Sequence, residues 1–202
     1  MQSQWHNCPT INGVQQKDGK RYKATDVSYS STEDTIKFSA DIAGGYPEEA
    51  DVKTWFRTIE FNQKLSTIVV TDKYELKKWI QPLKVHFISH LKPEKITGQI
   101  KLNNNGSTLL MDYDSKLFNV EFDTKIIDKE DNILRGIWGD SVHRMTLVEK
   151  QHQSDAHPLK GEFVTLFSLP KGEAVLEEEE VEEGNDVLDE EYLEVEEYFD
   201  DE

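Results

Sequence analysis

Apolar and polar residues alternate along several short stretches of the chain, and this pattern predicts β-strands. Residues 35–41 and 54–61 place every second side chain on one largely apolar face, as a half-buried strand does. Residues 65–72 are rich in β-branched side chains, which favour a pleated sheet. Further strands are predicted at residues 85–90, 95–102, 107–112, 117–127, 133–139, 142–149 and 161–169.

Turn-forming sequences separate these stretches, and few helical patterns lie between them. The predicted turns fall at residues 103–107, 129–132 and 139–141. One short helix is predicted at residues 75–83, where Pro82 would end it. No repeat of 20 to 50 residues is visible, which excludes a solenoid or a propeller. The sequence therefore predicts an all-β fold, an antiparallel β-sandwich of the supersandwich-like kind.

The charge of the chain divides it into two parts. The net charge of the 202 residues is -17, but residues 173–202 contain 17 acidic residues and no Lys or Arg. Of the 40 acidic residues this leaves 23, which balance the 23 basic residues elsewhere. We expect a neutral β-sandwich over residues 1–170 and an acidic, disordered tail over residues 171–202. The alternative for the tail is a short helix or motif that docks on a partner.

Several classes of function are excluded by what the sequence lacks. It has no run of about 20 apolar residues that would span a bilayer, and residues 1–10 do not resemble an export signal. Its one cysteine, Cys8, cannot form an internal disulfide or a cysteine-based zinc site, and a small buried apolar role is expected for it. No P-loop, GxSxG or HExxH motif is present. We expect neither a membrane nor a nucleic-acid partner.

The histidines and tryptophans have structural interpretations as well as functional ones. His86, His90 and His143 are expected to be polar surface residues of strands. The four tryptophans are candidates for stacking on sugar rings. A core position is the more common role of tryptophan, above all for Trp55 and Trp138, which fall in predicted strands.

The opening phrase WHNCPTING, residues 5–13, is the most distinctive stretch. Pro9 restricts the preceding residue to an extended conformation, and Asn12-Gly13 is a turn signal. The phrase therefore predicts a strand over residues 5–11 followed by a turn. His6 is a candidate metal ligand, with Asp26 as a source of an oxygen, and the alternative is a hydrogen-bonded structural histidine.

The stretch WHNCPTINGVQQKDGKRYKATDVSYS resembles the C-terminal β-domain of heparinase II/III-like polysaccharide lyases, including the oligo-alginate lyase branch. In that family a His-Asn pair leads a strand, an Asn-Gly or Asp-Gly turn follows, and then a Gln. His6-Asn7, Asn12-Gly13 and Gln16 match this order. A short β run after Ala24, WFRTIEF, STIVVTD and IWGDSVHRMTL are also similar to the family, so the resemblance covers residues 4–169.

The resemblance implies a domain rather than a whole enzyme. Family members carry an α/α toroid before the β-sandwich, and the substrate cleft lies between the two. They cleave uronate polysaccharides such as heparin, heparan sulfate or alginate by β-elimination, with catalytic groups mainly on the toroid. His6 matches the third ligand of a structural zinc whose other ligands lie upstream in the family. We therefore expect a C-terminal part of such a lyase, inactive alone, and periplasmic or secreted as its relatives are.

Three alternatives remain open from the sequence. The chain could be a complete lyase that uses His6 and a tyrosine such as Tyr22 as acid and base. It could be a stand-alone carbohydrate-binding module that retains an acidic polysaccharide without cleaving it. It could also be an interaction protein that acts through its acidic tail.

Overall fold

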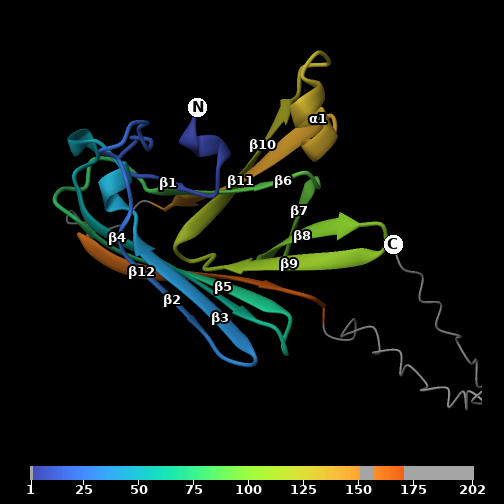
Figure 1. The fold of residues 1–202 in the computed structure, drawn as a ribbon, viewed down its shortest axis with the longest axis horizontal. Coiled ribbons are helices and arrows are strands. Elements are labelled where there is room, and N and C mark those ends of the chain that lie inside the picture. The colour runs from blue at the N-terminus through green and yellow to red at the C-terminus, as the bar shows by residue number, and fades with distance from the viewer. Residues whose placement is uncertain (1, 151–156, 171–202) are drawn as a thin grey trace, which may run out of the picture.

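The computed structural model describes residues 2–150 and 157–170, whose strands form two antiparallel sheets packed face to face (Figure 1). The smaller sheet has four strands in the order β1-β6-β11-β10. These are β1 (Pro9–Thr10), β6 (Lys84–Ser89), β10 (Phe118–Ile126) and β11 (Ser141–Glu149). The larger sheet has eight strands in the order β2-β3-β4-β5-β12-β9-β8-β7. These are β2 (Thr25–Ser31), β3 (Thr35–Asp41), β4 (Val52–Asn62), β5 (Thr67–Leu76), β7 (Pro93–Ile96), β8 (Gln99–Asn104), β9 (Ser107–Tyr113) and β12 (Lys160–Ser168). The predicted antiparallel β-sandwich is confirmed.

Short helical segments lie outside the two sheets. Three are 3-10 helices, η1 (Ser3–Trp5), η2 (Ala43–Gly45) and η3 (Glu48–Ala50), and one is the α-helix α1 (Asn132–Trp138). Figure 1 shows η1 next to the smaller sheet, on the side away from the larger one, and α1 at the tip of the β10–β11 hairpin. These two segments therefore flank the outer face of the smaller sheet.

The core lies between the sheets and is rich in aromatic rings. Trp55 of β4 is fully buried and stacks on Tyr74 of β5, with 5.3 Å between the ring centroids. Phe163 of β12 meets Phe118 of β10 edge to face at 5.0 Å, which joins the two sheets. Such pairs contribute about 0.5–1.5 kcal/mol each beyond the burial of their area. Trp55 is thus a core residue, as the alternation in residues 54–61 predicted.

Turn chemistry fixes the hairpins where the sequence predicted turns. Between β8 and β9, Asn105 and Gly106 both have positive φ, 47° and 100°. A two-residue turn of this kind matches the right-handed twist of the flanking strands, and Asn-Gly is its preferred sequence. The strands then pair in register from Asn104 with Ser107 to Gln99 with Asp112.

The helix predicted at residues 75–83 is wrong. Strand β5 continues to Leu76, whose amide donates to the carbonyl of Leu159 at 2.7 Å, and an irregular segment follows. Within that segment Trp79 packs its ring on His157 at 4.6 Å and Leu83 is 1% exposed. These tertiary contacts outweigh the modest helical preference of the sequence.

The strand predicted at residues 133–139 is also wrong, because this stretch is helix α1. The carboxylate of Asp131 accepts a hydrogen bond from the Leu134 amide at 3.0 Å and caps the helix. The apolar residues Ile133, Leu134 and Ile137 follow a helical spacing, yet all three are exposed. Trp138 therefore lies at the end of a surface helix and not in a core strand.

Two further strand predictions are only partly right. The single strand expected at residues 95–102 is two strands, β7 and β8, joined by a tight turn in which Gly98 has φ of 75°. The strand expected at residues 5–11 contains only Pro9 and Thr10 as strand β1, because η1 occupies Ser3–Trp5. The prediction of an acidic, disordered tail at residues 171–202 lies outside the described residues.

Candidate functional site

The opening phrase is anchored to the segments around it through its asparagines. The Asn12 side chain is 3% exposed and donates to the carbonyls of Ala50 at 2.8 Å and Lys78 at 2.9 Å. Its carbonyl oxygen accepts from the Ile80 amide at 2.8 Å. Asn12 and Gly13 both have positive φ, which confirms the predicted turn. Asn12 therefore anchors the phrase to two segments distant in sequence.

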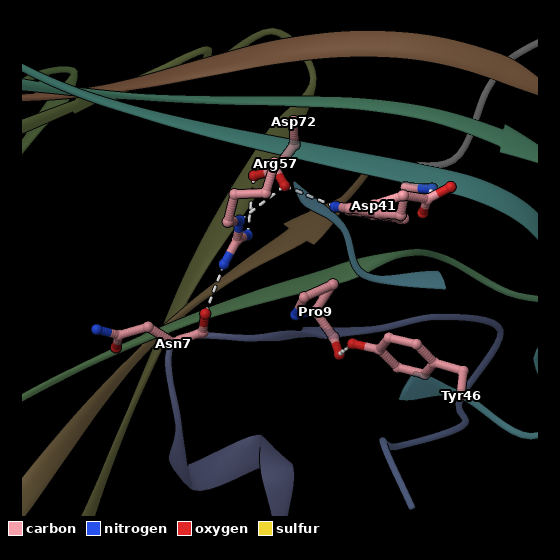
Figure 2. Close-up of polar contacts among 7 residues, drawn as sticks. Asn7, Pro9, Asp41, Tyr46, Arg57 and Asp72 are labelled. Atoms are coloured by element: carbon pink, nitrogen blue, oxygen red, sulfur yellow. Dashed lines mark hydrogen bonds and ion pairs between the residues drawn. The ribbon is translucent and has the colours of Figure 1, made fainter. Parts of the chain in front are cut away.

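A buried ion pair in the larger sheet faces the phrase (Figure 2). The guanidinium of Arg57 donates through Nε and Nη2 to the two carboxylate oxygens of Asp72, at 2.8 Å each. The indole N–H of Trp55 donates to the same carboxylate at 2.6 Å. The remaining terminal nitrogen of Arg57 donates to the carbonyl of Asn7. With Asp72 0% exposed and Arg57 8% exposed, this bidentate pair positions the phrase rather than a ligand.

Neighbouring contacts secure the rest of the phrase. The Tyr46 hydroxyl donates to the carbonyl of Pro9 at 2.6 Å, and burial raises the pKa of Tyr46 well above its usual value. The side-chain oxygen of Asn7 accepts from the Ile88 amide at 2.8 Å. Burial likewise raises the pKa of the half-buried Cys8 thiol, so Cys8 is not an activated nucleophile. The His-Asn pair thus has a structural asparagine and leaves its histidine outside the network.

His6 is exposed and lines a groove of about 690 Å³ between η1, the end of the β10–β11 hairpin and α1. The groove is mainly apolar, with Trp5 and Trp138 among its walls and Lys125 and Asp128 among its charged groups. Pockets of this size and composition are typical of small-ligand sites. The groove is the feature of the fold that brings His6 together with two indole rings.

Two cationic side chains, Arg144 and Lys125, hold Trp5 in place. The guanidinium of Arg144 lies over the Trp5 ring at 4.6 Å from its centroid, and the Lys125 ammonium lies at 5.8 Å. Arg144 also donates to Asp123 at 2.8 Å and to the carbonyl of Gln4 at 3.2 Å. Cation–π contacts of this kind contribute about 0.5–2 kcal/mol. These contacts attach η1 to the outer face of the smaller sheet.

His6, the predicted zinc ligand, is not joined by further zinc ligands in the part of the chain that the structure describes. No group of three His, Cys, Asp or Glu side chains that could hold a metal is found among residues 2–150 and 157–170. Asp26, the suggested oxygen donor, is an exposed residue of β2 and belongs to no such group. Because zinc takes about four protein or water ligands, His6 alone does not make a site.

A second, polar pocket of about 280 Å³ lies on the outer face of the smaller sheet. At its floor the ring of His86 is held between two hydroxyls, Thr10 at 2.8 Å from Nε2 and Thr146 at 3.0 Å from Nδ1. Burial, with smaller effects from the charges of Arg144 and Lys84, lowers the pKa of His86 to about 4. The ring is therefore neutral near pH 7.

The surface positions expected for His86 and His143 are wrong. His86 is 2% exposed, and His143 is 8% exposed on the central strand β11. The ring of His143 bonds to the hydroxyl of Thr124 at 2.9 Å, and burial lowers its pKa. Because each side chain is paired with a hydroxyl across the sheet, the neutral imidazole tolerates burial. His90 is exposed, as expected.

The polar pocket was missed by sequence reasoning, although a signal for it exists. Lys84 and His86 alternate along β6 with the buried apolar residues Val85 and Phe87. Alternation puts both polar side chains on the face opposite the core. What the sequence does not give is the register that sets Thr146 of β11 directly beside His86.

Tyr22, the tyrosine suggested for a complete lyase, does not share a cavity with His6. Its hydroxyl accepts from Arg21 at 2.8 Å, and the same guanidinium lies 4.7 Å from its ring centroid. Tyr22 lines a separate pocket with Tyr46, Glu48 and neighbouring residues. The geometry therefore does not assemble the acid and base of that alternative.

Two comparisons with known proteins give no relative of this chain. A scan against models of protein families finds no match. A search of curated proteins also finds none. In the described residues there is no helix of the length and apolar character needed to cross a membrane.

Proposed function

We propose that the chain is the β-sandwich domain of a polysaccharide lyase of the heparinase II/III kind, which holds a uronate polysaccharide beside the cleft without itself removing a proton. The observation that carries the proposal is the groove at His6, where the phrase that resembles this family places Trp5 and His6 beside Trp138 and Lys125. The groove combines apolar ring faces with one ammonium group, a combination suited to a carboxylated sugar.

Each wall of the groove has a role toward such a sugar. The indole of Trp138 offers a stacking surface for a pyranose ring, whereas the Trp5 ring, which Arg144 and Lys125 already contact, contributes to the apolar wall. The ammonium of Lys125 provides a charge partner for a uronate carboxylate, and the carboxylates of Asp128 and Asp131 accept hydrogen bonds from hydroxyls. The binding mode is therefore stacking with a few directed polar contacts.

The chemistry of β-elimination explains why the groove is assigned to binding and not to turnover. Elimination needs one group that neutralises the carboxylate and a second that accepts the proton from C5. Among the residues that line the groove, His6 is the one imidazole, and no tyrosine accompanies it. The resemblance assigns the catalytic groups mainly to a helical toroid.

The test is a titration of the full 202-residue chain with oligomannuronate, followed by intrinsic tryptophan fluorescence and by detection of unsaturated products. We expect saturable binding without product. Trp138→Ala should weaken binding by at least about tenfold, which is ~1.4 kcal/mol. Trp79→Ala is the matched control, because Trp79 stacks on His157 away from the groove.

Two outcomes would contradict the proposal. Steady formation of unsaturated product by the chain alone would make it a complete lyase. If the melting temperature of Trp138→Ala shows that the variant is folded and its binding is unchanged, the groove is not the sugar-binding site.

A stand-alone carbohydrate-binding module is the second candidate. The same titration separates the two, because a module that works alone needs a tight complex, whereas a domain that supports a cleft needs only weak affinity. Micromolar binding, about -8 kcal/mol, would favour the module.

A further inference from the structure

The polar pocket on the outer face of the smaller sheet has a hydrogen-bonding group left over at its floor. A neutral imidazole has one N–H donor and one acceptor nitrogen. One of Thr10 and Thr146 therefore donates its hydroxyl to the His86 ring, and the other accepts from it. The accepting threonine still has its own O–H, for which the structure shows no acceptor in the described residues. The floor of the pocket can therefore donate to a ligand oxygen.

Charges of both signs stand above this floor. Lys84 neighbours His86 on β6, and its ammonium makes no ion pair with the described carboxylates. Glu121 on β10 is exposed and likewise makes no ion pair with the described basic residues. Arg144 is already committed to Asp123 and to η1, so it forms a fixed wall. Besides the Arg144–Asp123 ion pair and the amides of Gln4, Gln15 and Gln81, the pocket thus offers one cation and one anion without an ion pair among the described residues, and one hydroxyl donor.

The register of the smaller sheet places these groups side by side. Glu121 of β10 lies opposite Thr146 of β11, and Thr146 lies opposite His86 of β6. Thr10 of β1 lies opposite Lys84. The groups therefore form one contiguous polar surface across four neighbouring strands, set by backbone pairing and not by flexible loops.

We propose that this pocket is a subsite for one hexuronate unit of the polysaccharide that the groove holds. The ammonium of Lys84 takes the carboxylate, the free threonine hydroxyl donates to a sugar oxygen, and Glu121 accepts from a sugar hydroxyl. The inference rests on the proposed function, because it names a second contact point for the same ligand. A volume of about 280 Å³ suits one sugar unit and not a chain of several.

The pocket and the groove lie on the same face of the smaller sheet. Glu121 lines the pocket and Lys125 lines the groove, four residues further along β10. At about 3.3 Å per residue this separation is roughly 13 Å, which is longer than one sugar ring. One ligand can reach both sites only as an oligosaccharide, so affinity should rise with chain length until both are occupied.

The test compares oligomannuronate with the neutral oligomannose of the same linkage, by calorimetric titration of the full chain. Lys84→Gln should weaken oligomannuronate binding by about two- to fivefold, the effect of losing a partly exposed charge pair. Binding of oligomannose should be unaffected. Lys101→Gln on β8, in the other sheet, is the matched control. Thr10→Val and Thr146→Val should each weaken both ligands, because either change disrupts the hydroxyl–imidazole chain.

The outcomes separate this inference from the function on which it rests. If Lys84→Gln matches Lys101→Gln while Trp138→Ala weakens binding, the pocket is not a subsite and the groove assignment stands. If neither oligosaccharide binds the folded chain, both proposals are overturned. An equal loss for the charged and the neutral ligand would also overturn the carboxylate role of Lys84.

Discussion

At the scale of single residues, buried polar side chains give the sandwich its particular arrangement. Arg57 and Asp72 satisfy each other in the larger sheet, and Arg57 also reaches the carbonyl of Asn7. The alternation in the sequence predicted the face that Arg57 shares with Trp55. It did not predict that Asp72 lies opposite Arg57, because that contact depends on the register of β4 and β5.

Because His86 is buried with a lowered pKa, we expect the free energy of unfolding to depend on pH. Its pKa is lowered from 6.5 to about 4 in the folded protein, so between these values the unfolded chain binds a proton that the folded chain does not. Stability from this residue is therefore complete above pH 6.5 and falls as the pH drops toward 4. The loss amounts to about 3 kcal/mol at most.

Urea unfolding at a series of pH values measures this contribution. The unfolding free energy of the wild type should decline more steeply between pH 6.5 and 4 than that of His86→Gln. His90→Gln is the control, since His90 is exposed. Parallel curves for the wild type and His86→Gln would contradict the buried, neutral imidazole.

At the scale of elements, local signals were sufficient where pattern and turn chemistry agreed. The predicted strand at residues 35–41 coincides with β3, and the Asn-Gly turn joins β8 to β9. The failures at residues 75–83 and 133–139 have different causes. In the first, the packing of Trp79 and Leu83 outweighs a modest helical preference. In the second, a short apolar run fits either a strand or a helix, and the Asp131 cap goes with the helix.

The pairing of β5 with β12 depends on a glycine, Gly161, which has no side chain. Gly161 lies opposite Tyr74, and a Cβ at Gly161 would come within 2.6 Å of the tyrosine oxygen and 2.7 Å of its ring. Tyr74 is buried and stacks on Trp55, so its ring is held beside Gly161 by packing. We expect Gly161→Ala to destabilise the fold by about 1–3 kcal/mol.

Thermal unfolding provides the measurement, with Gly136→Ala in helix α1 as the control. A Cβ at Gly136 meets no atom within 4 Å, so that change should be neutral or stabilising by up to about 1 kcal/mol. Tyr74→Phe should relieve only part of the Gly161→Ala effect, because ring carbons remain close. An unchanged melting temperature for Gly161→Ala would show that the ring adapts.

At the scale of the whole molecule, the two sheets are unequal and their outer faces differ. The eight-stranded sheet extends past the four-stranded one, so Phe38, Ile59 and Phe61 on its inner face remain 42%, 39% and 38% exposed. The outer face of the smaller sheet carries the groove and the polar pocket. Composition predicted a neutral sandwich, but where the sites fall depends on which face η1 and α1 flank.

In the function that we propose, a uronate polysaccharide lies along this outer face without being cleaved. A crystal structure of the full chain with oligomannuronate tests it most directly. We expect an intact sugar chain over the smaller sheet, with one ring against Trp138 and a carboxylate near Lys84. A sugar bound elsewhere on the sandwich, or a cleaved sugar with an unsaturated end, would contradict it.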